Sequence, residues 1–358
     1  MKILFVITGL TQGGAERVVC DLADNMYEKG NIVKIAYLTG DILTQPVHRE
    51  IELIKLGLNG LGSFLPGYIT LSKLIRSYCP NVVHAHMVHA NILTRLIRLT
   101  TTIDKLICTA HSSNEGGKLR MCLYRVTHNL ADLTTNVSDT AVASFEEKRA
   151  VPKKSMRTTY NGIDFERFSY NPEAKKELTE ELNLYPKCRI ILSVGRFNIQ
   201  KNYPNLLKAT DILKRKYFID FRLLIAGDGE LRSELEQLII DLDLEHEVTL
   251  LGRRRDIPRL MSACDVFVLS SNNEGLPTVL IEALACQAHI VSTDVSGVRE
   301  IVGDYGKIVS INNPEHLAEC IFNSLNHKNK NELGCEYVKN KFELNTITNE
   351  WLKIYNET

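Results

Sequence analysis

Residues 266–293 read VFVLSSNNEGLPTVLIEALACQAHIVST. Residues 266–269 and 289–293 are short apolar runs, and residues 278–286 between them have the length and composition of a helix. Val- and Ile-rich runs separated by helices are typical of parallel strands that are buried on both faces. This stretch therefore predicts a strand–loop–helix–strand unit, and with it a parallel sheet.

The same alternation extends on both sides of this stretch. Further strands are predicted over residues 2–8, 32–38, 52–56, 81–85, 105–110, 133–136, 189–195, 221–226 and 248–251. Helices are predicted over residues 15–29, 71–78, 118–130, 203–217, 231–242 and 257–262, and from about Ala90. The segment 161–172 is rich in turn-forming residues and fits a linker.

These elements predict an α/β protein with two Rossmann-like, doubly wound domains. The expected domains are residues 1–165 and 166–340, and residues 341–358 are expected to form a helix that crosses back to the first domain. Ligands bind beyond the carboxyl ends of parallel strands, so the natural site is a cleft between two such sheets.

Composition limits the possible functions. The 358 residues include 43 Lys and Arg and 43 Asp and Glu, so the formal net charge is zero. A nucleic-acid partner would favour a basic excess, which this chain lacks, so we expect no nucleic-acid partner. The charge is uneven, however, because residues 1–165 hold 19 basic and 14 acidic residues.

Nine scattered cysteines without a C-x-x-C pair favour a reducing compartment. The apolar start MKILFVI is too short for a signal peptide, and no apolar segment approaches the ~18 residues that span a bilayer. We therefore expect a cytoplasmic protein, at most peripheral on the inner face of the cytoplasmic membrane.

The loop and helix of the opening stretch carry the most specific pattern. Glu274 lies in the loop, and Glu282 follows eight residues later, about one turn into the helix. Gly275 permits unusual backbone angles, and Pro277 suits a first helical turn. The N–H groups near residues 276–279 would face a phosphate, and Glu282 is placed to accept hydrogen bonds from vicinal hydroxyls.

Two other loops offer groups for an anion. Gly195 and Arg196 follow a predicted strand, and Lys201 comes five residues later, so a guanidinium and an ammonium leave one loop. Two solvated loop charges are the alternative. Gly13 and Gly14 join the first strand to the first helix, which favours contact with an anion or a sugar over a simple tight turn.

His111 directly follows a predicted strand, so a ligand-facing role is favoured over a core role. His84, His86 and His89 have metal-like spacing but no companion Cys or carboxylate cluster, and lining the cleft is the preferred interpretation. Residues 241–243 have the D-x-D form, yet they end an amphipathic helix and are better explained as a solvated face. No metal site is predicted.

In combination, these motifs resemble the GT-B retaining glycosyltransferases of glycosyltransferase family 4. The resemblance covers nearly the whole chain. It rests on GGAE (13–16), TAH (109–111), YNGID (160–164), SVGR (193–196), KN (201–202), AGDG (226–229) and NEGLPT (273–278).

The resemblance implies a nucleotide-diphosphate sugar as donor, with UDP expected. Arg196 and Lys201 would bind the diphosphate beside Gly195, Glu282 the ribose hydroxyls, and Glu274 the donor sugar. His111 would lie near that sugar and touch a hydroxyl. Gly13 and Gly14 would close on the phosphate or sugar from the first domain, and Arg253 would lie beside the base. The remaining donor-binding positions would form a cradle for the distal phosphate: Gly275, Leu276, Pro277, Thr278 and Val279.

A departing nucleoside diphosphate gains charge in the transition state, which preorganised cations and helix N–H groups stabilise. These groups can replace a divalent metal, so no metal and no cofactor is expected. His111, Glu274, Arg196 and Lys201 are the candidate catalytic residues. By the resemblance, the reaction is a front-face displacement with retention, in which the leaving phosphate takes the acceptor proton.

The expected acceptor is a saccharide, lipid-linked, as in the synthesis of O-antigen or capsule polysaccharide. Residues 73–128 hold eight basic residues against two acidic ones, which suggests attraction to an anionic lipid or to a pyrophosphate-linked acceptor. Ordinary solvated helix faces are the alternative. The candidate acceptor or membrane residues are Arg95, Arg98, Lys118, Arg120 and Arg125.

Two other functions stay open at this point. A GT-B nucleotide-sugar epimerase would turn over the donor without an acceptor. An inactive scaffold subunit would bind the sugar nucleotide and catalyse nothing.

Overall fold

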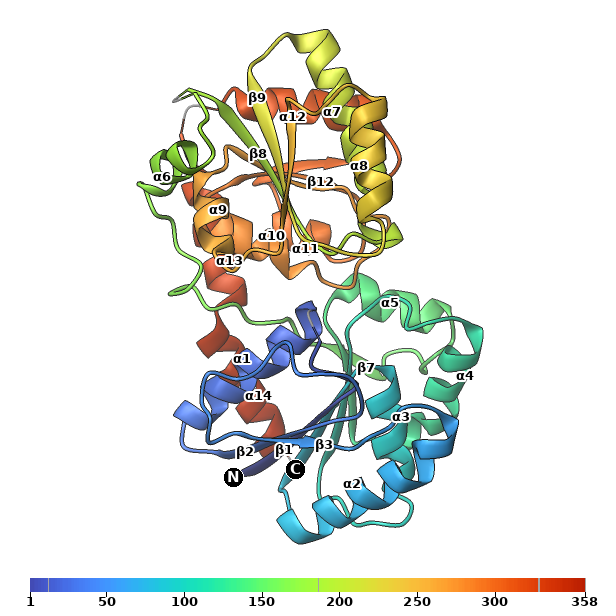
Figure 1. Ribbon diagram of the computed structural model, residues 1–358. Helices are drawn as coiled ribbons and strands as arrows, with labels where there is room; N and C mark the ends of the chain where they lie inside the picture. The colour runs from blue at the N-terminus through green and yellow to red at the C-terminus, as the bar shows by residue number, and fades with distance from the viewer. Residues whose placement is uncertain (12, 186, 328, 358) are drawn as a thin grey trace. The chain divides into compact units, whose positions relative to one another are not determined.

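The computed structural model describes residues 1–11, 13–185, 187–327 and 329–357. The chain divides into two compact units (Figure 1). The first unit contains residues 1–163 together with residues 342–358, and the second contains residues 164–341. The C-terminal segment thus belongs to the same unit as the N-terminus.

The first unit is built on a seven-stranded parallel sheet in the order β3-β2-β1-β4-β5-β6-β7. β1 pairs with β2 on one side and with β4 on the other, so the strand order reverses between β1 and β4. In such sheets ligands bind beside this reversal. The strands are β1 (Lys2–Ile7), β2 (Ile32–Tyr37), β3 (Glu52–Lys55), β4 (Val82–His86), β5 (Leu106–Ala110), β6 (Leu133–Asn136) and β7 (Met156–Thr158).

Helices cover both faces of this sheet because its strands are apolar on both sides. Phe5 of β1 packs with Val19 and Trp351, whereas its neighbours Leu4 and Val6 pack on the opposite face with the second and third helices. The helices are α1 (Gly14–Glu28), α2 (Phe64–Tyr78), α3 (Val88–Ile97), α4 (Lys118–Thr127), α5 (Asp139–Glu147) and α14 (Leu344–Asn356), with 3-10 turns at Leu61–Ser63 and His128–Leu130.

The C-terminal helix α14 is fastened to the first unit at both ends. It lies beside α1, red beside blue in Figure 1. Near its C-terminus, Lys105 Nζ donates a hydrogen bond to the carbonyl oxygen of Ile354 at 2.5 Å. Before its N-terminus, Ile163 bridges to Glu343, and a Cβ at Gly162 would lie 2.8 Å from Leu344 Cα. Gly162 therefore lets the two chain segments pass in close contact.

The second unit contains a six-stranded parallel sheet in the order β10-β9-β8-β11-β12-β13, with its reversal between β8 and β11. Its strands are β8 (Arg189–Val194), β9 (Phe221–Ala226), β10 (Val248–Gly252), β11 (Val266–Leu269), β12 (His289–Thr293) and β13 (Gly306–Val309). Its helices are α6 (Ala174–Glu181), α7 (Tyr203–Tyr217), α8 (Arg232–Asp241), α9 (Ile257–Ala263), α10 (Thr278–Ala285), α11 (Val298–Val302), α12 (Pro314–Leu325) and α13 (Glu332–Phe342), with a 3-10 turn at Ile199–Lys201.

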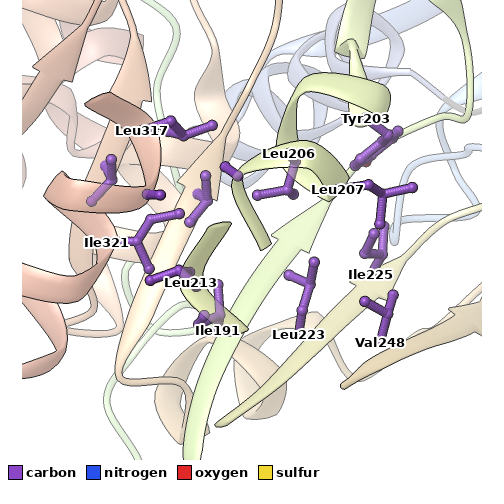
Figure 2. Close-up of a cluster of buried hydrophobic side chains, with 14 of the residues drawn as sticks. Ile191, Tyr203, Leu206, Leu207, Leu213, Leu223, Ile225, Val248, Leu317 and Ile321 are labelled. Carbon is purple, nitrogen blue, oxygen red and sulfur yellow. The ribbon is translucent and has the colours of Figure 1, made fainter. Parts of the chain in front are cut away.

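A cluster of buried aliphatic side chains fixes α7 and α12 on this sheet (Figure 2). Leu206 and Leu213 of α7 pack with Ile321 of α12 over strand residues such as Ile191 and Leu223, and all five are essentially inaccessible. Burying one such side chain stabilises the fold by about 1.5–3 kcal/mol. The loop that enters α7 is thereby held against a rigid support.

The predicted strands and helices are present, with ends that shift by a few residues, but several elements were not predicted: α5, α6, α11, α12, α13, β7 and β13. α2 also begins at Phe64 rather than at the predicted residue 71, and its first turns contain Pro66 and Gly67. Pro66 lies in the first turn, where its missing N–H is not needed. A Cβ at Gly67 would lie 2.1 Å from Leu58 Cδ1, so this glycine gives room for packing.

Within the described parts of the chain, no helix is long and apolar enough to cross a membrane.

Candidate active site

Two loops at the carboxyl edge of the second sheet are joined backbone to backbone. Gly195 N–H donates to the Ala226 carbonyl and Phe197 N–H to that of Asp228, both at 3.0 Å. A Cβ at Gly227, where φ is +151°, would lie 1.9 Å from Gly195 O. Glycine is therefore required at 227 for the loops after β8 and β9 to meet.

Gly195 has a second effect on this edge. A Cβ at this position would lie 3.0 Å from Lys201 Cε and from the Tyr203 hydroxyl. Glycine at 195 thus leaves space for the stem of Lys201. Lys201 is itself fixed, because its backbone N–H donates to Asn198 Oδ1 at 3.1 Å.

Lys201 and Glu274 meet although 73 residues separate them in the sequence. Lys201 Nζ lies 2.7 Å from Glu274 Oε1, and Ser271 Oγ donates to the same oxygen at 2.7 Å. Both charged side chains are mostly buried, at 20% and 17% exposure. The structure therefore brings together two of the four candidate catalytic residues as an ion pair at the end of β11.

Arg196 and Arg253 stay largely accessible on neighbouring loops. The Arg196 side chain is 65% exposed and its guanidinium lies 3.1 Å from Glu230 Oε2. The Arg253 side chain is 62% exposed, with Nε 3.9 Å from Asp228 Oδ2. Exposed pairs of this kind contribute little to stability, so a phosphate can replace the carboxylates at low cost.

The phosphate cradle proposed at residues 275–279 is a buried loop followed by the N-terminus of α10. The helix begins at Thr278, so Pro277 is its N-cap residue rather than part of its first turn. Ser296 Oγ donates to Gly275 O at 3.2 Å, and a Cβ at Gly297, where φ is +78°, would lie 2.7 Å from that carbonyl oxygen. The loop after β12 thus braces the cradle, a contact that no pattern in the sequence predicts.

The α10 N-terminus concentrates positive potential at this edge. The first N–H groups of an α-helix have no intrahelical acceptor, and its dipole places partial positive charge there. Here these belong to Thr278 and Val279, preceded by the buried Leu276. Glu282 lies one turn further into α10 and is partly exposed.

In the first unit, Gly13 and Gly14 begin α1, as N-cap and first helical residue. A Cβ at Gly13 would lie 2.4 Å from Glu16 Oε2. Glu16 is buried, which raises the pKa of its carboxyl group, and it accepts a hydrogen bond from Thr11 Oγ1 at 2.8 Å. A carboxylate beside this turn suits a sugar hydroxyl better than a phosphate.

His111 stands at the end of β5, next to His86 at the end of β4. His111 Nε2 and His86 Nδ1 lie 2.9 Å apart. Burial lowers the pKa of His111 to about 4 and that of His86 well below its usual value, so both rings are neutral at pH 7. His84 is buried in the core, bonded to Tyr355 and Thr109, and His89 is exposed.

Glu115 holds the backbone of His111 in place. Its Oε1 accepts the His111 N–H at 2.8 Å, and its Oε2 accepts the Tyr124 hydroxyl at 3.1 Å. Burial raises the pKa of this carboxyl group to about 7. In the sequence Glu115 is only an acid within a basic segment, because nothing local indicates that its side chain folds back on its own loop.

The basic residues proposed for acceptor or membrane contact fall into two groups. Arg95 is fully buried and donates to Tyr124 O, Thr127 Oγ1 and Thr134 Oγ1 at 3.2, 3.3 and 2.8 Å, so its assignment to a surface was wrong. The prediction counted basic residues along the sequence, and such a count does not distinguish an arginine on the buried side of α3 from one on its exposed side.

The other four are not buried. Arg98 is partly exposed and pairs with Asp132 at 2.7 Å, while Lys118, Arg120 and Arg125 are exposed on α4.

Across the described residues, no group of three or more His, Cys, Asp or Glu side chains is placed to hold a metal ion.

Solved structures share this two-domain architecture. Anabaena HepE in complex with UDP matches with a TM-score of 0.83 at 20% identity, covering 99% of each chain. WaaG, a glycosyltransferase involved in lipopolysaccharide biosynthesis, matches with a TM-score of 0.76 at 16% identity, over 99% of this chain and 100% of the other. The fold is therefore GT-B, the class that the motifs indicated.

Sequence comparison gives the family. Residues 12–167 match the model described as Glycosyltransferase Family 4, and residues 174–340 match that described as Glycosyl transferases group 1. A Campylobacter jejuni relative, N-acetylgalactosamine-N,N'-diacetylbacillosaminyl-diphospho-undecaprenol 4-alpha-N-acetylgalactosaminyltransferase, is 30% identical over 333 residues, 88% of each chain. The chain belongs to glycosyltransferase family 4 and is a glycosyltransferase.

A second relative from the same organism extends the match along the whole chain. GalNAc-alpha-(1->4)-GalNAc-alpha-(1->3)-diNAcBac-PP-undecaprenol alpha-1,4-N-acetyl-D-galactosaminyltransferase is 28% identical over 376 residues, covering 100% of this chain and 99% of its own.

Proposed function

We propose that this glycosyltransferase moves a sugar from a UDP-sugar to a lipid-linked saccharide, with retention of configuration and without a metal. The ion pair of Lys201 with Glu274 beside the α10 N-terminus carries the proposal, because it combines a phosphate-binding cation with a carboxylate for the sugar. The UDP bound to HepE and the undecaprenol-diphosphate saccharides named for the two relatives support the donor and acceptor classes.

The second unit binds the donor through its diphosphate. Arg196 offers a guanidinium that is weakly engaged by Glu230, and Lys201 offers an ammonium group. The N–H groups of Thr278 and Val279 add hydrogen-bond donors at a helix N-terminus, which suits a phosphate oxygen. Glu282 accepts from the ribose hydroxyls and Arg253 borders the base.

The same groups assist departure of the nucleotide. Negative charge on the leaving diphosphate grows as its bond to the sugar breaks, and preorganised donors stabilise that charge most in the transition state. Glu274 meets the donor sugar, and its ion pair with Lys201 holds it in position. This supply of positive charge takes the place of a divalent cation.

His111, from the first unit, meets a hydroxyl of the donor sugar. The sugar ring gains positive charge as the diphosphate leaves, and a neutral imidazole does not oppose that charge. The acceptor hydroxyl attacks the anomeric carbon on the face from which the diphosphate departs. Its proton passes to the leaving phosphate oxygen, which gives retention.

The acceptor is proposed to lie at an anionic membrane surface on which α4 rests. Leu119 is 75% exposed, Val126 69% and Leu123 36%, and they lie at helical spacing. The exposed Lys118, Arg120 and Arg125 flank them on the same helix. A helix with exposed apolar residues and basic flanks fits the interface of an anionic leaflet. The protein would then be peripheral on the inner face of the cytoplasmic membrane.

A panel of nucleotide sugars with a polyprenyl-diphosphate saccharide tests the function directly. We expect thermal stabilisation by one UDP-sugar and transfer only in the presence of acceptor, with NMR of the product reporting the donor's anomeric configuration. Chelator should leave the rate unchanged. Conversion of donor without acceptor would instead identify an epimerase, and tight donor binding without any turnover a scaffold subunit.

A further inference from the structure

We propose that His86 is a positioning residue that fixes the proton of His111 on Nδ1, so that His111 presents an N–H donor on its accessible side. The consequence for catalysis rests on the proposed function, since it assumes that His111 meets the donor sugar. The tautomer itself does not rest on that function.

The pairing of the two rings follows from the sheet. In the parallel register of β4 with β5, His86 lies opposite Thr109, and His111 follows two residues later, just past the strand end. His86 Nδ1 and His111 Nε2 are 2.9 Å apart, with ring centroids at 5.2 Å. Between two neutral imidazoles such a contact is one hydrogen bond, so one ring donates and the other accepts.

The far nitrogen of His86 decides which ring donates. His86 Nε2 is buried, and no described residue offers it a hydrogen bond. If His111 were the donor, His86 would carry its own proton on Nε2, as a buried N–H without an acceptor. Buried N–H groups are left unpaired less often than acceptors are. The favoured arrangement is therefore His86 Nδ1–H donating to His111 Nε2, with the His111 proton on Nδ1.

The rest of the cluster holds His86 in this orientation. Its ring lies 4.0 Å from that of His84 and 5.7 Å from that of Phe5, centroid to centroid. His84 is fixed in turn by the Tyr355 hydroxyl at 2.6 Å and Thr109 Oγ1 at 2.7 Å. The rotation of His86 that would break its bond to His111 is thus resisted by packing on both sides.

The backbone after His86 is also constrained. Met87 has φ of +72° and ψ of +158°, a conformation that non-glycine residues rarely adopt. Two backbone bonds hold it, from Met87 N–H to Thr109 O at 3.1 Å and from Asn91 N–H to Met87 O at 2.9 Å. Backbone strain of this kind persists only where the surrounding structure determines it, which is expected beside a preorganised group.

On its accessible side, His111 Nδ1 bonds to no described residue. The nearby carboxyl group of Glu115 is engaged with the backbone N–H of His111 and with Tyr124, not with the ring. The donor on Nδ1 is therefore available to an oxygen of the sugar. With His86 removed, the His111 proton would be free to move to Nε2, and the ring would present a lone pair instead.

The test is ¹⁵N NMR of histidine-labelled full-length protein near pH 7.5, combined with transfer kinetics. In the wild type we expect the His111 proton on Nδ1. In His86→Leu we expect a shift towards Nε2–H and a kcat lowered 10-fold or more, with the Kd for UDP unchanged. His86→Asn, whose amide N–H can take the place of Nδ1–H, should retain the tautomer and most of kcat.

The control is His246→Asn, which changes an exposed histidine of the second unit outside the cluster and should alter neither readout. A wild-type His111 protonated on Nε2 would overturn the proposal without any variant, so it remains testable even if His86→Leu does not fold. An unchanged tautomer in folded His86→Leu would overturn it as well. A shifted tautomer with unchanged transfer would support the positioning by His86 and instead remove His111 from the proposed mechanism.

Discussion

Lys201 Nζ lies 2.7 Å from Glu274 Oε1, so the 3-10 turn after β8 and the loop after β11 are joined by a partly buried ion pair. Ser271 Oγ donates to the same carboxylate oxygen. Each partner therefore orients the other. The pair lies beside α10, where the proposed donor phosphate and sugar meet.

Replacing Lys201 by Met tests the phosphate role of this pair. We expect kcat to fall by about 10²–10³, the usual effect of removing one preorganised donor to a developing anion. Glu274→Gln should lower kcat as well, and the double variant should lose less than the sum of the two free-energy effects, because the residues are in contact. Lys214→Met, on the outer side of α7, is the control. Single variants within threefold of wild type would contradict the assignment.

The position of the candidate donor-binding side chains at one sheet edge could be predicted because their signals are local. Glu274 and Glu282 lie in one strand–loop–helix unit, and Arg196 with Lys201 leave one loop, so their spacing alone places them at a sheet edge. The glycines that make the edge possible are different. Gly227 and Gly297 are needed because of backbone atoms 32 and 22 residues away in the chain, at Gly195 and Gly275. A single sequence does not reveal such pairs.

Burial was the property that the sequence could not supply. Arg95 lies on α3 between Thr94 and Leu96, and only the packing of α3 against α4 shows that it points inward. The contacts of Glu115 and His86 could not be predicted either, because Glu115 folds back on its own loop and His86 meets His111 across two strands. Short elements such as β13 and α11 were not predicted because four or five residues show too little periodicity.

The proposed membrane surface predicts a charge-dependent loss of vesicle binding. Reversing Arg120 and Arg125 to Glu should weaken binding to phosphatidylglycerol vesicles by at least about 2 kcal/mol, roughly 30-fold, since each basic residue near an anionic surface contributes about 1 kcal/mol. Vesicle sedimentation at low and physiological salt measures this. The matched control changes Lys208 and Lys216, which are exposed on α7 of the second unit, to Glu. Equal losses in both double variants would point to net charge alone.

The apolar residues of α4 give an independent check on the same surface. Leu119→Ser with Val126→Ser removes exposed side chains, so the free energy of unfolding should change by less than about 0.5 kcal/mol. Vesicle binding should nevertheless weaken, and the weakening should persist at high salt because insertion of apolar groups is not screened. Unchanged binding in this variant would limit the contact to electrostatics.

Arg95 should contribute to the stability of the fold and not to lipid binding. In Arg95→Leu, Tyr124 O and the hydroxyl groups of Thr127 and Thr134 lose a buried donor, which costs about 1–3 kcal/mol per unsatisfied group. We expect the free energy of unfolding, from urea titration, to fall by at least about 3 kcal/mol, the low end of this range for three groups. The folded fraction should bind vesicles like wild type. A loss of lipid binding with unchanged stability would show that Arg95 does contact the membrane.

The buried histidines predict a loss of stability in mild acid. The pKa of His111 is lowered to about 4 from 6.5, and those of His84 and His86 are well below 6.5, so the unfolded chain binds more protons between these values. The stability from these histidines is complete above pH 6.5 and falls as the pH drops towards 4, by up to about 1.4 kcal/mol per pH unit for each histidine. Urea titrations from pH 7.5 to 5 measure this fall. His246→Asn, which removes an exposed histidine outside the cluster, should leave the slope almost unchanged, and a flat profile would contradict the burial of the cluster.

Glu115 makes the opposite contribution, and a glutamine isolates it. Its pKa is raised from 4.5 to about 7 by burial, so the folded protein keeps a proton that the unfolded chain releases between these values. The stability from Glu115 is therefore present below pH 4.5 and lost as the pH rises to 7. Glu115→Gln stays neutral at every pH. Relative to wild type, this variant should gain about 2–3 kcal/mol in the free energy of unfolding between pH 5 and pH 8, as measured by urea titration. A constant difference would show that the carboxyl group is ionised in the folded protein across the range, and that it holds the His111 backbone as a carboxylate.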